Sequence, residues 1–107
     1  MNSRAKGKNC ELELKDVLIE EGFTEARRGQ QFSGGSDSPD VVGLPGVHVE
    51  CKRVEAGNLY SWLDQAIRDA GELNTPVVMH RRNRREWVAI LRLSDFLTLY
   101  RNAHHAK

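Results

Sequence analysis

Two acids and a lysine in the middle of the chain, Asp40, Glu50 and Lys52, are the residues best placed to do chemistry. Glu50 and Lys52 are two apart in the apolar stretch 47–53, so strand alternation puts both side chains on one face. Asp40 begins the preceding short strand. The connection between the strands, residues 43–46, is short enough to form an antiparallel hairpin, which brings Asp40 alongside Glu50, Cys51 or Lys52.

Two carboxylates and an ammonium on one patch of sheet suit the hydrolysis of phosphodiesters. Two carboxylates hold a hard divalent cation such as Mg²⁺, which polarises a phosphate and lowers the pKa of bound water. A lysine can orient or deprotonate that water and offset charge in the transition state. On an exposed strand, however, Glu-x-Lys is more often a solvated pair. The valine-rich strand around Glu50 and the position of Glu11, bordering a helical apolar stripe, favour the catalytic interpretation.

These residues must be positioned by elements that the hydrophobic periodicity indicates. Gly22 follows the first helix, and Asn58 is a good cap for the second. A final helix, capped by Ser94 and Asp95, frays near His104. Helices are expected over 8–21, 58–72 and from 94 on, and strands over 23–31, 39–43, 47–53, 77–80 and 86–91. The order α-β-β-β-α-β-β-α predicts an α/β fold with a mixed central sheet flanked by helices.

The chain of 107 residues is long enough for one domain, expected over 1–107 with residues 1–7 as a flexible basic arm. No apolar run is long enough to span a membrane and the N-terminus is no signal peptide, so the cytoplasm of a bacterial, archaeal or phage-infected cell is expected. Cys10 and Cys51 are too few for a disulfide framework and both fall on core-facing sides, so a redox role has little support. A net charge of +1 permits an anionic partner without demanding one.

The motif residues resemble those of the PD-(D/E)XK nuclease superfamily. Pro39 and Asp40 are followed, after nine residues, by Glu50-Cys51-Lys52. The resemblance extends over residues 6 to about 91. The basic opening, the helix that carries Glu11, the Gly-Ser loop before Asp40 and the helix with Gln65 are similar to archaeal Holliday-junction-resolving enzymes and their phage relatives.

The resemblance implies a single restriction-endonuclease-like domain with assigned site residues. Asp40 and Glu50, with the backbone carbonyl of Cys51, would bind Mg²⁺, for which Mn²⁺ substitutes; no organic cofactor is implied. Lys52 would be the catalytic lysine. Glu11 would complete the acidic site, and Gln65 would touch the site or the substrate.

The same resemblance implies contacts to DNA from basic and hydroxyl side chains. One of Arg27 and Arg28 would contact phosphates. The other candidates lie in the N-terminal arm, in the Gly-Ser loop and at a hairpin tip: Lys6, Lys8, Ser36, Ser38, Arg81, Arg82, Arg84 and Arg85. For the hairpin arginines a solvated turn is an equal alternative. With few residues left to read base edges, recognition of DNA shape and backbone is expected.

The sequence thus predicts a Mg²⁺-dependent DNA endonuclease that acts on branched or structured DNA, with a four-way junction as the leading substrate. Cutting both strands of a junction needs two sites, so a homodimer is implied, through outward Leu12 and Ile19 or through the last helix. The alternatives are a nicking or flap nuclease from a phage or mobile element, and a module that binds nucleic acid without cutting it. His48 shares the face of Glu50 and could reach the metal site, but an ordinary strand residue is the favoured interpretation. Trp62 and Trp87 are expected in the core, with base stacking as the less favoured alternative.

Overall fold

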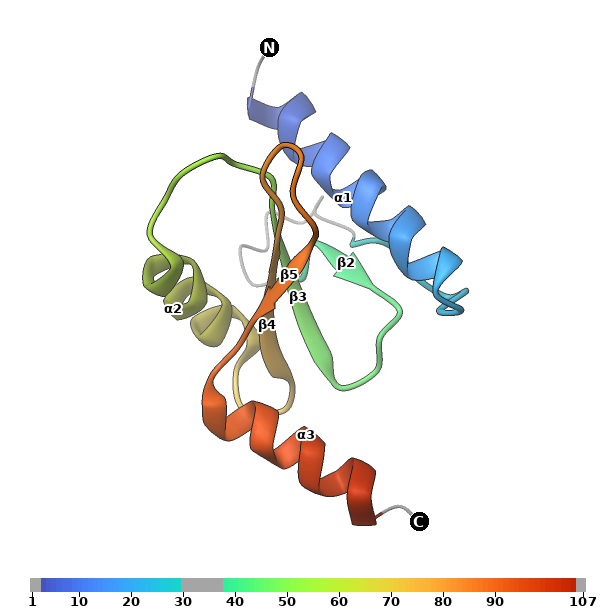
Figure 1. Ribbon diagram of the computed structural model, residues 1–107, viewed down its shortest axis with the longest axis vertical. Coiled ribbons are helices and arrows are strands. Elements are labelled where there is room, and N and C mark those ends of the chain that lie inside the picture. The colour runs from blue at the N-terminus through green and yellow to red at the C-terminus, as the bar shows by residue number, and fades with distance from the viewer. Residues whose placement is uncertain (1–2, 30–37, 106–107) are drawn as a thin grey trace.

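The computed structural model describes residues 3–29 and 38–105, and in this part of the chain a five-stranded sheet carries helices on its two faces (Figure 1). The elements are α1 (Ser3–Glu20), β1 (Arg27–Arg28), β2 (Val41–Val42), β3 (Val47–Lys52), α2 (Leu59–Ala70), β4 (Thr75–His80), β5 (Val88–Ile90) and α3 (Leu93–His105). Their order is the predicted one. None of the helices in the described ranges is long and apolar enough to cross a membrane.

The sheet is mixed, with strand order β1-β2-β3-β4-β5. The central strands β3 and β4 are parallel, and the other neighbours are antiparallel. Helix α2 makes the crossover between the two parallel strands, and the Asn58 side chain caps its first turn by accepting from two backbone N–H groups. The predicted mixed α/β sheet is therefore confirmed, including the β2–β3 and β4–β5 hairpins.

The side chains of β3 alternate between two layers, as the period of two predicts. Val47, Val49 and Cys51 pack towards α1, whose Leu14 and Leu18 complete the main core cluster. The side chains of His48, Glu50 and Lys52 face the other way, towards the layer that α2 covers. The strand that carries the candidate catalytic residues is thus covered on both faces.

The N-terminal segment differs from its expectation as a flexible arm. Helix α1 begins at Ser3, so the backbone of residues 3–7 is helical and the helix is longer than the predicted 8–21 at its start. Alanine, arginine and lysine in this segment are good helix formers, and Gly7 lowers the propensity without ending the helix. The backbone of residues 3–7 is therefore part of α1.

The two cysteines also differ from their expectation, because a disulfide joins Cys10 on α1 to Cys51 on β3. Their Cα atoms are 6.4 Å apart, within the range that a disulfide bridges. Cys10 lies one helical turn before Leu14 and Cys51 lies two residues after Val49. The packing of these two apolar neighbours brings the sulfur atoms together.

Helix α3 extends away from the sheet at the end of the molecule opposite the N-terminus (Figure 1). It has no buried residue, and its apolar side chains include Phe96 at 48%, Leu97 at 42% and Tyr100 at 55% exposure. Isolated helices of about this length are marginal in water. An apolar stripe therefore stands uncovered on the last helix of the chain.

Candidate active site

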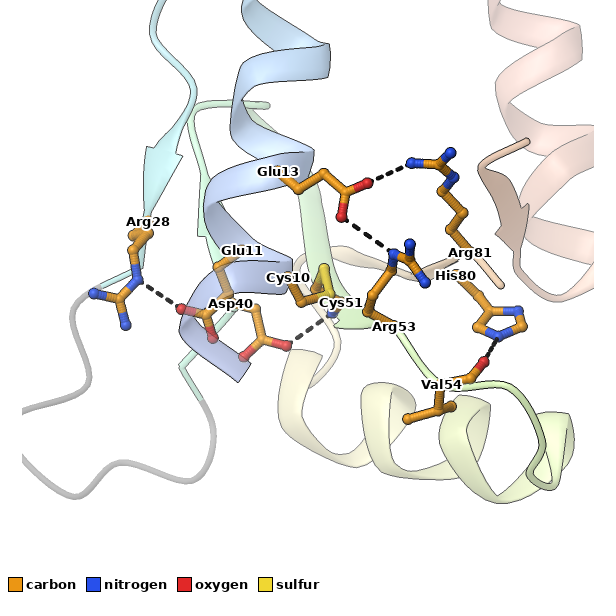
Figure 2. The surroundings of a disulfide bond; sticks show 10 residues. All are labelled: Cys10, Glu11, Glu13, Arg28, Asp40, Cys51, Arg53, Val54, His80 and Arg81. Carbon is orange, nitrogen blue, oxygen red and sulfur yellow. Dashed lines mark hydrogen bonds and ion pairs between the residues drawn. A yellow bond between two sulfur atoms is a disulfide. The ribbon is translucent and has the colours of Figure 1, made fainter. Parts of the chain in front are cut away.

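Asp40 lies directly before β2 and is held against β3 by two hydrogen bonds. Its backbone N–H donates to the Val49 carbonyl at 2.8 Å. One of its carboxylate oxygens, Oδ2, accepts from the Cys51 N–H, also at 2.8 Å (Figure 2). The pairing of Val41 with Val49 sets this register. The short hairpin thus places Asp40 beside Cys51, as the sequence predicts.

Gly29 makes a close approach to the backbone around Asp40. Its N–H donates to the Asp40 carbonyl at 2.9 Å. A Cβ at this position would lie 2.0 Å from the Pro39 carbonyl oxygen, which is backbone and has little freedom to move. A glycine is therefore required where the end of β1 fixes the backbone of the candidate catalytic aspartate.

Glu50 is buried next to Asp40, with 7% of its surface exposed. Burial raises its pKa to about 9, and the negative charge of Asp40, a hydrogen bond to Asp40 and the charge of Asp69 act in the same direction. The Lys52 ammonium opposes this shift. Two carboxylates this close to each other resist ionising together, and a cation bound between them would remove that resistance.

Glu11 reaches the same place from α1. It is 7% exposed, and burial raises its pKa, while a hydrogen bond from Arg28 lowers it and the charge of Asp40 raises it. The Arg28 Nε lies 2.8 Å from Glu11 Oε1 (Figure 2). Arg27, by contrast, donates to the Glu25 carbonyl. Of the two arginines that the sequence leaves open, Arg28 is the one beside the acids.

Lys52 lies close enough to Glu50 for its charge to act on that carboxylate, whereas Gln65 is placed only by its position on α2. Lys52 is half-buried on β3, on the same face as Glu50. Gln65 is exposed on α2, one helical turn before Asp69. The structure therefore gathers Glu11, Asp40, Glu50 and Lys52 around the end of β3, with Gln65 on the helix that covers this face.

The basic hairpin between β4 and β5 is tied to α1 by an acid that sequence reasoning missed. The two oxygens of Glu13 accept from Arg81 and, at 3.2 Å, from Arg53 (Figure 2). Arg82, Arg84 and Arg85 are exposed. Glu13 lies two residues after Glu11. A single glutamate on a helix is too common in sequences for this ion-pair partner to be predicted. Arg81 thus belongs to an ion-pair network, whereas three arginines of the hairpin remain at the surface.

A cavity of about 740 Å³ lies between this hairpin and the start of α2. Trp62, His80 and the exposed arginines are among its lining residues. The indole of Trp62 contacts the His80 ring, with 4.8 Å between ring centroids. Trp62 is thus half-buried at a cavity wall, while Trp87 packs against the main core.

The remaining predicted contacts are placed less fully. Lys8 is exposed on α1, and Ser38 is half-buried directly before the Pro39–Asp40 segment. The backbone of residue 6 belongs to α1, but the Lys6 side chain lies outside the described part. Ser36 is likewise outside the described residues.

The geometry of Asp40, Glu50 and Lys52 agrees with a family match over nearly the whole chain. Residues 2–106 match the family model described as "Phage putative PDDEXK endonuclease". The chain belongs to the PD-(D/E)XK endonuclease superfamily. The comparisons with curated proteins and with solved structures gave no significant match.

In this PD-(D/E)XK endonuclease, the motif residues present an oxygen-rich ligand set. Asp40 and Glu50 supply carboxylates, and the Cys51 carbonyl points to the same strand edge as its N–H because a residue on a strand directs both groups to one neighbour. The carbonyl of the next residue, Lys52, faces the other side of β3, where it accepts a hydrogen bond from the backbone N–H of Arg81, directly after β4, at 3.1 Å. The negative charges of Asp40 and Asp69 raise the pKa of Glu50, and a divalent cation would neutralise this repulsion. The donor set therefore fits a hard cation.

Proposed function

We propose that this endonuclease is a Mg²⁺-dependent deoxyribonuclease, with Asp40, Glu50 and the Cys51 carbonyl as ligands of the cation. Mn²⁺ is expected to substitute for Mg²⁺. The observation that supports this most strongly is the pair of neighbouring carboxylates, with Asp40 held at the Cys51 N–H and Glu50 buried beside it. When bound, the cation would polarise the scissile phosphate and make water more acidic.

The other groups of the site have roles that follow from their charges and positions. Lys52 would orient and deprotonate the attacking water and offset negative charge that develops on the phosphate. Glu11 would accept hydrogen bonds from water at the site, and Arg28 would hold Glu11 in place. Gln65 would contact the water or the substrate from α2.

Phosphates outside the scissile bond would be bound by basic and hydroxyl side chains around this site. Arg28 is adjacent to the acids. The others proposed are Lys6 and Lys8 on α1, Ser36 and Ser38 before Asp40, and the hairpin residues Arg81, Arg82, Arg84 and Arg85. Because Arg81 is paired with Glu13, we expect the three exposed arginines to contribute more to DNA affinity. Contacts to phosphates position a duplex without reading its sequence.

We further propose branched DNA, with the four-way junction first, as the substrate, and a homodimer as the active form. Symmetric cutting of a junction needs two sites. The uncovered apolar stripe of α3, which includes Phe96, Leu97 and Tyr100, is the surface that supports a dimer best. On α1, Leu12 is half-buried and Ile19 is 38% exposed, a smaller apolar surface. Light scattering tests the dimer: Phe96→Glu should give a monomer, whereas Ile19→Glu should leave the dimer intact.

The experiment that tests the substrate compares labelled four-way junction, flap, duplex and single strand in Mg²⁺. Paired symmetric cuts in the junction support the proposal. Cutting of flaps or plain duplex at equal rates would replace it with a nicking or flap nuclease. Binding of all substrates without cutting would favour a binding module with this fold.

A further inference from the structure

A second group of metal-ligating side chains lies beside the acidic site, in the layer between the sheet and α2. It consists of His48 and Glu50 on β3 and Asp69 near the end of α2. One ligand atom from each residue lies within 4.8 Å of the others. The His48 Nε2 and the Glu50 Oε1 are 2.8 Å apart. His48 is 3% exposed and Glu50 7%, whereas Asp69 is half-buried, so the group lies at the edge of the interior.

The topology explains why these residues meet. Helix α2 links two parallel strands and must run back along the sheet, so its last turn returns to the start of β3. Asp69 is in that last turn, and His48 is the second residue of β3. Strand alternation then points His48 and Glu50 to the layer that contains Asp69.

The carboxylate of Asp69 is only partly satisfied. Its Oδ2 is buried from solvent and has no hydrogen-bond donor among the described residues. A buried acceptor without a partner costs about 1–3 kcal/mol, and more when it is charged. The same carboxylate has an oxygen within 4.8 Å of the ligand atoms of His48 and Glu50. A bound cation would satisfy it.

The dimensions and the donor types fit a divalent ion with three protein ligands. Ligand bonds of about 2.1 Å place neighbouring ligand atoms roughly 3 Å apart and opposite ones roughly 4.2 Å apart. A group that spans 4.8 Å at most needs to contract by about 0.6 Å if its most distant atoms become opposite ligands, and by up to about 2 Å if they become neighbouring ones. One imidazole and two carboxylates suit Mn²⁺ or Zn²⁺ better than Mg²⁺, which prefers an all-oxygen shell.

We propose that His48, Glu50 and Asp69 form a second divalent-cation site, selective for an ion that accepts an imidazole ligand. The site extends the proposed function, on which it rests for the role of Glu50 as a ligand shared with Asp40. Two cations that share one carboxylate form the arrangement that stabilises both the attacking and the leaving oxygen in phosphoryl transfer. The competing interpretation is an internal hydrogen-bonded group in which His48 orients Glu50 and no ion binds.

Counting Mn²⁺ ions by calorimetry tests the site, in a chain whose exposed His104 and His105 are both replaced by glutamine. We expect two ions per chain for this parent, and one each for the added substitutions Asp69→Asn and Asp40→Asn. The matched control is His80→Gln. The His80 ring is also on a strand but bonds to the Val54 carbonyl, so two ions should remain. In Asp69→Asn, the second site should weaken by more than the roughly 10–100-fold that loss of a ligand's hydrogen-bond partner costs, so only one ion should be counted at concentrations that fill both sites of the parent.

A second readout uses the unaltered chain. Titration with Zn²⁺ should shift the ring ¹⁵N resonance of His48 Nε2, because direct coordination changes that nitrogen. One ion in the parent chain, two in Asp69→Asn, or an unmoved His48 resonance at saturating Zn²⁺ would each overturn the proposal. Failure of the nuclease proposal can be distinguished from failure of the second site. If the wild type cuts no DNA but Asp69→Asn still binds one ion fewer than the parent, the second site exists without the nuclease activity. If the wild type cuts DNA with Mg²⁺ but Asp69→Asn still binds two ions, the second site does not exist.

Discussion

Replacing Glu50 by glutamine should stabilise the metal-free protein above neutral pH, although it removes a proposed catalytic ligand. The pKa of Glu50 is raised from 4.5 to about 9 by burial and by Asp40 and Asp69. Below pH 4.5 both the folded and unfolded states hold the proton, so there is no penalty. As the pH rises towards 9, the unfolded chain releases the proton and the folded chain retains it, so folding stability falls.

The magnitude follows from the size of the shift. Each pKa unit is about 1.4 kcal/mol, so the 2.5 units between 4.5 and pH 7 correspond to roughly 3 kcal/mol at that pH. A glutamine has nearly the shape of a protonated glutamate and carries no charge. Glu50→Gln should therefore match the wild type near pH 4 and exceed its unfolding free energy by up to about 3 kcal/mol at pH 7.

Urea unfolding in EDTA, followed by tryptophan fluorescence from pH 4 to 9, measures this difference. Glu20→Gln, at an exposed position of α1, is the matched control and should leave the pH dependence unchanged. Adding Mg²⁺ should stabilise the wild type more at pH 8 than at pH 6, because the ion competes with the proton. If Glu50→Gln is less stable than the wild type by the same amount at every pH, the carboxylate is not held under strain by its neighbours and the reasoning is wrong.

Three other expectations concern the supports of the site. Arg28→Ala should weaken DNA binding and reduce the slope of log affinity against log salt by about 1. Arg27→Ala should have a smaller effect on both quantities. Equal effects of the two substitutions would contradict the assignment of Arg28 as the phosphate-binding arginine. Gly29→Ala should reduce cleavage by displacing Asp40, whereas Gly7→Ala, where a Cβ meets open space, should leave cleavage unchanged. Circular dichroism should show that both variants are folded. Full activity of Gly29→Ala would refute the close approach at this position. Reduction of the disulfide, which spans 41 residues, should lower the unfolding free energy by up to about 4 kcal/mol, and a chain with both cysteines replaced by alanine should not respond to the reductant.

The placement of the motif residues follows from short-range patterns in the sequence. The alternation over 47–53 fixes the two faces of β3, and the short connection before it makes Asp40 the neighbour of Cys51. These features depend on residues fewer than fifteen apart, so register and turn length decide them.

The features that the sequence analysis missed depend on how helices pack on the sheet. Asp69 joins His48 and Glu50 only through the crossover of α2, and Glu13 meets Arg53 and Arg81 only through the rotation of α1. The disulfide likewise depends on the distance between a helix and a strand that lie 41 residues apart in the chain. Side chains such as these have ordinary sequence surroundings, and tertiary packing alone brings them together.

The most direct test of the account is single-turnover cleavage of a labelled four-way junction by the wild type and by Lys52→Ala, each in Mg²⁺ and in EDTA. Exposed Lys8→Ala is the matched control for the loss of one positive charge. We expect cleavage by the wild type in Mg²⁺, none in EDTA, and a loss of at least about a hundredfold in rate with Lys52→Ala at saturating enzyme, with a small change for Lys8→Ala. Cleavage that continues in EDTA, or that survives Lys52→Ala undiminished, would contradict the proposed active site.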